Sequence, residues 1–323
     1  MQLKYGCNPH QGFASIEPIE AGTAPRELLN GNPSYINLLD ALNAWQLVAE
    51  VRQATGLAAA TSFKHVSPAG AAVACELEPA LAEAYEVPGV ELTDAALAYV
   101  RARGADPKCS FGDFAALSDP VDTATAKFLK GVVSDGIVAP DFESEALDIL
   151  KAKKGGGFIV LRADPDFRAP EREAREVFGM RLVQDRNNRM VCGADLDEVV
   201  CGELTEAARR DLLLGLVALK YTQSNSVGYA LDGQMIGIGA GQQSRVDCTK
   251  LAGSKGDLWY LRTHPKVLAL HFKKGVKRQE RINWRVRYIE GDLTRFETEA
   301  LADCLEGSLD LLTDDERREW LSK

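Results

Sequence analysis

The feature that most constrains the fold is a regular alternation of helical and strand-like segments between about residues 37 and 165. Leu38, Leu42 and Trp45 recur at helical spacing and predict an amphipathic helix over about 37–53. Strand-like runs at about 58–63, 114–119, 134–140 and 157–163 alternate with helical segments at 92–104, 121–131 and 143–154. Strands that alternate with helices imply a layered α/β domain.

The chain divides into three predicted parts. After an extended N-terminal arm, the alternating series closes a first domain, a charged and proline-bearing stretch connects it onward, and a second α/β domain with a helical C-terminal region follows. The expected boundaries are 1–165, 166–203 and 204–323. Within the last part, two β-rich runs flank Asp232 and Gly233, which predicts a β-hairpin.

Charge and cysteine usage narrow the class of partner. The net charge of −9 repels nucleic acid, so an anionic ligand would need a local basic pocket. The longest apolar run, at 212–219, is too short to cross a bilayer, and the N-terminus has no apolar signal region. The seven cysteines form no C-x-x-C pair, which favours reduced thiols. We therefore expect a cytoplasmic protein that binds a small molecule and contacts neither nucleic acid nor membrane.

Two adjacent basic residues, Lys64 and His65, stand where the strand at 58–63 ends. An imidazole suits proton transfer near neutral pH, and an ammonium can bind an anion or stabilise developing negative charge. Neighbours on a regular strand point to opposite faces, so both can serve one site only where the chain bends. We expect that bend in the turn-like residues Ser67–Gly70. The alternative is a hydrogen-bonded structural histidine beside a solvated lysine.

Two polar segments lie in the second predicted domain. Small polar residues at 220–226 are costly to bury unpaired, so they suit either recognition of a planar polar ligand through Asn225 or a self-satisfying turn. Glycines at 237–241 precede a helix and can cradle an anion, to which Arg245 adds charge. Their spacing fits neither G-x-G-x-x-G nor a P-loop.

Other motifs have two interpretations each. Phe111 and Phe114 flank a Gly-Asp pair and provide either an aromatic wall or core packing. The basic stretch 271–278 is either a solvated helix face or interface, or a ligand clamp. The four histidines are scattered along the chain, so no metal site is predicted.

Taken together, eight blocks resemble, in order and spacing, the AICAR transformylase family. This is the transformylase part of the bifunctional purine-biosynthesis protein that also carries IMP cyclohydrolase. The similarity runs from residue 2 to about 323. The blocks are KYGCNPHQ (4–11), YINLLDALNAWQLV (35–48), SFKHVSPAGAA (62–72), RARGAD (101–106), SFGDFAALSD (110–119), VSDGIVAP (133–140), KYTQSNSVGYA (220–230) and IGIGAGQQSR (236–245).

This resemblance implies two cytidine-deaminase-like three-layer α/β domains without zinc, plus a helical C-terminal region. It implies a homodimer with active sites at the subunit interface. The reaction would be transfer of a formyl group from 10-formyltetrahydrofolate, as co-substrate, to the 5-amino group of AICAR. The product, FAICAR, belongs to de novo purine (IMP) biosynthesis.

The resemblance also implies roles for single residues. Lys64 and His65 match the catalytic pair: His65 would help to remove the amine proton, and Lys64 would stabilise the tetrahedral intermediate or protonate the leaving folate nitrogen. Asn225 matches the residue that orients the carboxamide and the reacting amine. The remaining matches are Lys4, Tyr5, Asn37, Gly112 and Asp135 for the nucleotide, and Phe111, Arg245 and Val246 for the folate.

Departures from the family pattern leave more than one function open. Lys4 stands where the family usually has a phosphate-binding arginine, which keeps the charge but loses the bidentate fork. We also expect this chain to lack the family's cyclohydrolase domain and its C-terminal segment with further folate and phosphate contacts. The leading hypothesis is a stand-alone formyltransferase. The alternatives are a non-catalytic AICAR- or purine-nucleotide-binding paralogue and a formyltransferase with another donor.

Overall fold

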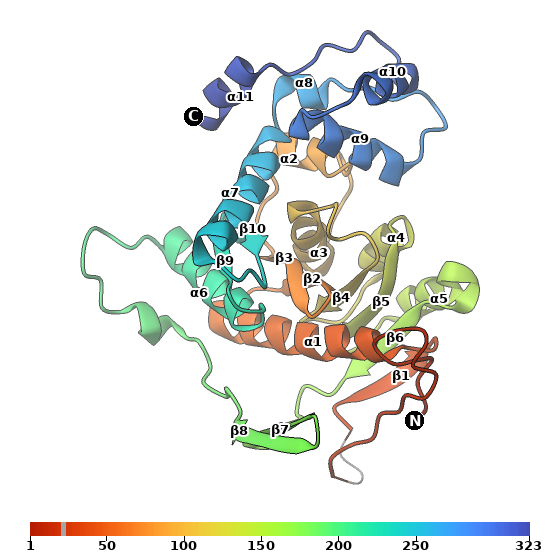
Figure 1. The fold of residues 1–323 in the computed structure, drawn as a ribbon, viewed down its shortest axis with the longest axis vertical. Helices are drawn as coiled ribbons and strands as arrows, with labels where there is room; N and C mark the ends of the chain where they lie inside the picture. The colour runs from red at the N-terminus through yellow and green to blue at the C-terminus, as the bar shows by residue number, and fades with distance from the viewer. Residues whose placement is uncertain (21–23) are drawn as a thin grey trace.

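The structure, a computed structural model, describes residues 1–20 and 24–323. An eight-stranded mixed sheet in the order β1-β6-β5-β4-β2-β3-β10-β9 forms its centre, with helices on both faces (Figure 1). The α/β class is therefore confirmed. The strands of the sheet are β1 (Arg26–Asn30), β2 (Ala59–Lys64), β3 (Ser67–Val73), β4 (Asp113–Leu117), β5 (Ser134–Ala139), β6 (Ile159–Ala163), β9 (Val227–Leu231) and β10 (Gln234–Gly239).

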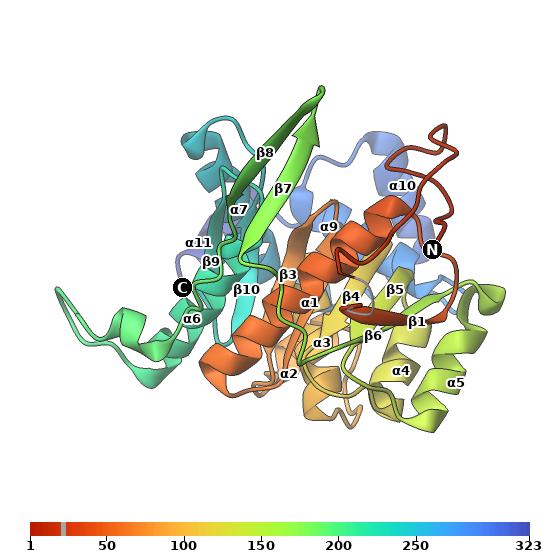
Figure 2. The ribbon, with the colours of Figure 1, turned by 90° about the horizontal axis from the view of Figure 1, so that it is seen from below.

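Helices cover both faces of this sheet. Helices α1 and α6 pack on one face, and α3, α4, α5 and α7 pack on the other (Figures 1 and 2). The helices are α1 (Tyr35–Thr55), α2 (Pro79–Ala84), α3 (Asp94–Ala105), α4 (Thr123–Lys130), α5 (Ser144–Ala152), α6 (Glu206–Lys220), α7 (Arg245–Leu261), α8 (Pro265–Leu268), α9 (Arg278–Glu290), α10 (Arg295–Cys304) and α11 (Asp314–Leu321). The predicted helix over 37–53 corresponds to α1.

Alternation along the central strands divides the interior into two cores. Ala59 and Phe63 of β2 face α1, whereas Ala60 faces α3. All five residues of β4 are buried, as expected for a strand covered on both faces. This double burial explains why the central strands read as nearly continuous apolar runs.

The sheet runs across the predicted domain boundaries. Strand β10 pairs antiparallel with β3 through Gln234 and Ala72, so strands from both predicted domains share one sheet. The three-part division and the cytidine-deaminase-like assignment stay predictions. Within the predicted connector, β7 (Arg172–Val177) and β8 (Met180–Asp185) form a separate hairpin that stands off the body (Figure 2).

The bend expected at Ser67–Gly70 is wrong. These residues belong to β3, and the chain reverses one step earlier, at His65 and Val66. Pro68 and Gly70 occur in β3 for reasons other than a turn. A register shift pairs Ser62 with Gly70 but Phe63 with Pro68, and such a bulge accommodates a proline within a strand. A Cβ on Gly70 would lie 2.1 Å from a carbonyl oxygen of α3, so close helix packing requires this glycine.

Candidate functional site

Most of the predicted site residues come from elements that meet where β2 turns into β3. We call this the hairpin end of the sheet and define it by Lys64–Ser67. Because of the strand directions, β3, β4, β5 and β9 begin there, and β2 and β10 end there. Hydrogen bonds connect the N-terminal part of α1 to this end directly, and the start of α7 through the loop at 223–225. Helix N-termini carry partial positive charge.

Lys64 and His65 occupy the tip of this hairpin. The Lys64 ammonium donates a hydrogen bond to the carbonyl oxygen of Phe111. A Cβ on the neighbouring Gly112 would lie 3.9 Å from Lys64 Nζ. The imidazole of His65 is exposed and forms no hydrogen bond with any residue that the structure describes. Phe111 is 44% exposed, whereas Phe114 is buried in the core, so only Phe111 is available to a ligand.

A buried polar network supports the loop that carries Phe111 and Gly112. The carboxylate of Asp113 accepts hydrogen bonds from Ser62 Oγ at 2.7 Å, Tyr99 Oη at 2.9 Å and an Arg103 guanidinium nitrogen at 2.6 Å. Arg103 also donates to the carbonyl oxygen of Ser110 over 2.7 Å. Paired buried charges of this kind hold a loop in one geometry. The network therefore fixes the loop beside the Lys64 ammonium.

Asp40, on α1, is a site residue that sequence reasoning missed. Its Oδ1 accepts a hydrogen bond from the backbone N–H of Val66 over 2.6 Å, directly at the hairpin tip. The side chain is buried, and burial raises the pKa of Asp40 to about 6, although the Val66 N–H and the charge of His65 act in the opposite direction. The available signal was an acid at a position between the buried apolar residues Leu38 and Ala41.

The loop that carries Asn225 is attached to the same hairpin. The backbone N–H of Gln223 donates to Ser67 Oγ over 3.3 Å, and Ser67 is the strand partner of Lys64. Asn225 Nδ2 donates to the carbonyl oxygens of Gln242 at 2.8 Å and Gln243 at 3.2 Å. These bonds satisfy part of the polar segment through partners outside it, rather than within the segment itself, and they direct the amide nitrogen of Asn225 toward the backbone of residues 242–243. Its Oδ1 has no hydrogen-bond partner among the described residues.

Arg245 and Val246 begin α7, one residue after the two glutamines that Asn225 contacts. The side chain of Ser244 caps this helix by accepting from the backbone N–H of Asp247. Arg245 is exposed, and Val246 is 62% exposed. A cationic and an apolar side chain are thus presented to solvent at the start of α7, next to the segment that the Asn225 amide contacts.

Lys4 and Tyr5 lie beside the N-terminus of α1, because their backbone pairs with residues 33–35. Asn37 is in the first turn of that helix, one turn before the carboxylate at the hairpin tip. Its Oδ1 accepts from the backbone N–H and hydroxyl of Ser34, at 3.0 and 2.8 Å, in a capping box. Helix capping therefore occupies the side-chain oxygen of Asn37.

Asp135 is the second residue of β5 and is half-exposed. It forms an ion pair with Lys154. Its charge also acts on Asp40, whose pKa it helps to raise. Asp135 therefore belongs to the same electrostatic environment as the hairpin tip.

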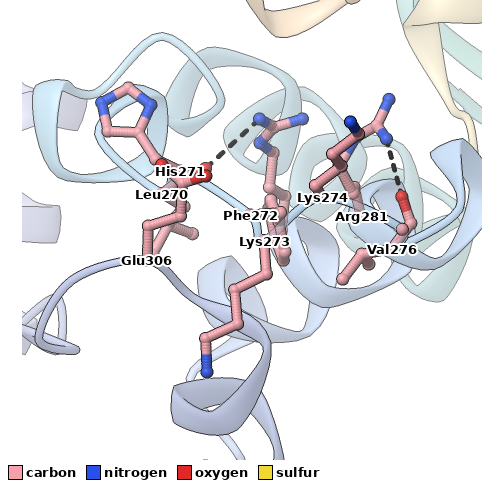
Figure 3. A pocket seen from close by; sticks show the side chains of 10 residues that line it. Leu270, His271, Phe272, Lys273, Lys274, Val276, Arg281 and Glu306 are labelled. Carbon is pink, nitrogen blue, oxygen red and sulfur yellow. Dashed lines mark hydrogen bonds between the residues drawn. The ribbon is translucent and has the colours of Figure 1, made fainter.

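A cavity of about 440 Å³ lies in the C-terminal helical region and contains no predicted site residue (Figure 3). The basic stretch 271–278 forms much of its wall as a loop before α9, rather than the expected helix face. Arg281 and Arg285, which also line it, bind the carboxylate of Glu86 at 2.8 and 2.6 Å. The cationic wall is thus partly neutralised, and we do not place the site there.

The part of the chain described by the structure contains no group of three or more His, Cys, Asp or Glu side chains arranged to hold a metal ion. Within the same residues, no helix is both long and apolar enough to span a bilayer. All seven cysteines are free.

Fold and site together define a class: an α/β protein with a half-buried lysine and an exposed histidine side by side at the end of a sheet, near polar loops and helix N-termini. Comparison with known proteins makes this specific. Residues 1–255 match the AICARFT/IMPCHase bienzyme family. The chain belongs to this family.

Curated relatives give the same result. The chain is 35% identical over 256 residues to the bifunctional purine biosynthesis protein PurH of Cereibacter sphaeroides, a match that covers 78% of this chain and 45% of the relative. The protein of the same name from Brucella anthropi is 34% identical over 258 residues, which cover 79% and 44% respectively. The chain thus spans less than half the length of the curated relatives it matches.

Proposed function

We propose that this chain is an enzyme of cytoplasmic purine biosynthesis that transfers the formyl group of 10-formyltetrahydrofolate to the 5-amino group of AICAR. Family membership supports a role in this pathway. The observation that carries the finer proposal is the hydrogen bond between Gln223 and Ser67. It attaches the Asn225 loop to the hairpin that presents Lys64 and His65, so three groups suited to acyl transfer come from one end of the sheet.

The chemistry requires one base and one acid. As the amine attacks the formyl carbon, a C–N bond forms. His65, which is exposed and has no hydrogen-bond partner among the residues the structure describes, accepts the proton that the amine loses. The C–N bond to the folate then breaks, and its nitrogen takes the electron pair and a proton. The Lys64 ammonium, anchored to Phe111 through one N–H, has two more N–H groups to stabilise the oxyanion or to protonate that nitrogen.

Substrate binding is proposed from the positions of the remaining groups. Lys4 and the positive end of α1 suit a nucleotide phosphate, and Asn37, Gly112 and Asp135 border the same end of the sheet. The exposed side chains of Phe111, Arg245 and Val246 suit the aromatic and anionic parts of a folate.

A second copy of the chain is part of this proposal. The β7–β8 hairpin exposes apolar residues along its length, and Phe178 at its tip is fully exposed. A two-stranded hairpin is marginally stable alone, and monomers rarely expose contiguous apolar surface. We infer that this arm packs on a partner copy in a homodimer with active sites at the interface. The finer fold assignment, two cytidine-deaminase-like units that join at β3 and β10, belongs to the same proposal.

The test is direct assay of purified protein with AICAR and 10-formyltetrahydrofolate, followed by detection of FAICAR. We expect turnover that His65→Ala or Lys64→Ala abolishes while the fold is retained. Absence of turnover at high enzyme concentration contradicts the proposal. Calorimetric binding of AICAR without turnover would instead favour the non-catalytic binding protein, for which Lys4 in place of an arginine is the supporting observation.

A further inference from the structure

Two hairpins of the main sheet end in two-residue loops whose central residues both have positive φ. In the β9–β10 turn these are Asp232 at +49° and Gly233 at +73°. In the β2–β3 turn they are His65 at +51° and Val66 at +61°. Positive φ at both positions favours Asn-Gly or Asp-Gly sequences. A β-branched residue such as valine is a strong exception, because its side chain crowds the backbone at positive φ.

Each turn is held by a carboxylate from a helix on the same face of the sheet. Asp211 of α6 accepts the N–H groups of Asp232 and Gly233, at 2.8 and 2.6 Å. Asp40 of α1 accepts the N–H of Val66 at 2.6 Å, in the place equivalent to Gly233. A carboxylate therefore binds the backbone of both turns. The residues of the β9–β10 turn favour positive φ, whereas Val66 in the β2–β3 turn does not.

The surroundings of the two carboxylates differ. Asp211 forms an ion pair with Arg210 at 3.0 Å. Asp40 is 6% exposed and has no ion-pair partner among the described residues. The charged groups that act on it are His65 and Asp135, and the latter is itself paired with Lys154. A buried carboxylate is costly unless a cation or hydrogen bonds compensate it, and the N–H of Val66 supplies such a bond to Asp40.

We propose that Asp40 is a positioning residue for the formyl transfer proposed above. Its carboxylate holds Val66 and, through it, the backbone of His65 in the left-handed conformation, so that the imidazole is presented outward at the hairpin tip. The inference rests on the proposed function for its kinetic consequence. Its structural content, that Asp40 keeps a disfavoured turn in place, is independent of any substrate.

The experiment uses the full chain with four variants. Asp40→Ala removes the acceptor, and Asp40→Ala with Val66→Gly also removes the conflict between residue and turn. Asp211→Ala is the matched control, and Asp40→Asn keeps an acceptor of the same size. We expect Asp40→Ala to lower kcat by about 10- to 100-fold with KM for AICAR within about threefold, because a displaced base acts on the chemical step. The glycine should restore most of the loss, and Asp211→Ala should change kcat by less than about twofold.

Three results would overturn the proposal: kcat within about twofold of the parent in Asp40→Ala, a loss that Val66→Gly does not relieve, or an equal loss in Asp211→Ala. If the alanine variant does not fold, Asp40→Asn decides, since loss of activity with the acceptor retained rules out positioning through this hydrogen bond. Hydrogen exchange of the Val66 amide separates this inference from the proposed function. If the parent protein transfers no formyl group, Asp40→Ala must still increase that exchange at least about tenfold, and unchanged exchange rejects the inference.

Discussion

The β9–β10 turn and the β2–β3 turn lie at opposite ends of the strands and share backbone conformation, loop length and a capping carboxylate. They differ in residue choice. At Asp232 and Gly233 the local preference agrees with the turn, and a Cβ on Gly233 would come within 2.6 Å of Cys75 Sγ, so glycine is required. At His65 and Val66 the preference conflicts with the turn. Such conflicts persist where function selects the side chain, so the comparison supports the proposal that the hairpin tip is the functional turn.

The largest expected effect separates the two turns by activity. His65→Ala should lower formyl transfer by at least about 100-fold, because general acid-base catalysis contributes 10²–10⁴, and should leave unfolding unchanged because the imidazole is exposed. Asp232→Ala, at the equivalent position, should change kcat by less than about twofold. Steady-state kinetics and thermal unfolding of both variants test this. Similar kinetic losses would remove the distinction between the turns.

The second effect separates them by stability. Gly233→Val should destabilise the protein by about 3 kcal/mol, from positive-φ strain together with overlap onto Val73 and Cys75. The β2–β3 turn tolerates valine at its equivalent position. Urea unfolding measures the difference. A loss below about 1 kcal/mol would show that the β9–β10 turn relaxes around a side chain. The preference of glycine for positive φ would then not explain the difference between the two turns.

A third prediction concerns the pH dependence of stability. The pKa of Asp40 is raised to about 6 by burial, so the native state binds its proton more tightly than the unfolded chain. Its contribution to stability is therefore complete below about pH 4 and is lost as pH rises through about 6. The pKa of Asp40 differs by about two units between the native and unfolded states, which amounts to about 3 kcal/mol of stability at most. The free energy of unfolding of Asp40→Asn should fall less than that of the parent between pH 5 and 7.5. Parallel curves would show that Asp40 does not titrate in this way.

The sequence predicted which residues lie at the hairpin end better than it predicted the contacts that connect them. Helical spacing predicted α1, strand-like runs between helices predicted the central strands, and the Asp232-Gly233 pair predicted the hairpin, because in these segments local preference and tertiary structure agree. The bend after Lys64 was placed wrongly, since Pro68 and Gly70 satisfy a bulge and a close helix contact rather than a turn. Asp40 was missed because its importance depends on a contact with Val66, 26 residues away.

The hairpin within residues 166–203 was also missed. A charged and proline-bearing stretch is typical of a connector, and the strands β7 and β8 bury little within their own chain. A strand that buries no face within its own chain needs no regular apolar pattern, so the sequence offers no periodicity from which to predict it. If a second copy covers this arm, the contacts that stabilise the hairpin are made between chains, and a single sequence does not show which residues take part.

The smallest effect tests the conflict at the hairpin tip directly. Val66→Gly relieves about 1–2 kcal/mol of positive-φ strain but gives the unfolded chain more freedom, which costs about 0.5–1 kcal/mol. A net gain of up to about 1 kcal/mol in the free energy of unfolding is expected, measured by urea titration against Gly233→Ala, which must lose stability. Destabilisation by Val66→Gly would mean that the valine side chain makes contacts worth more than the strain. The conflict between residue and turn would then not mark function, and the case for His65 would depend on kinetics alone.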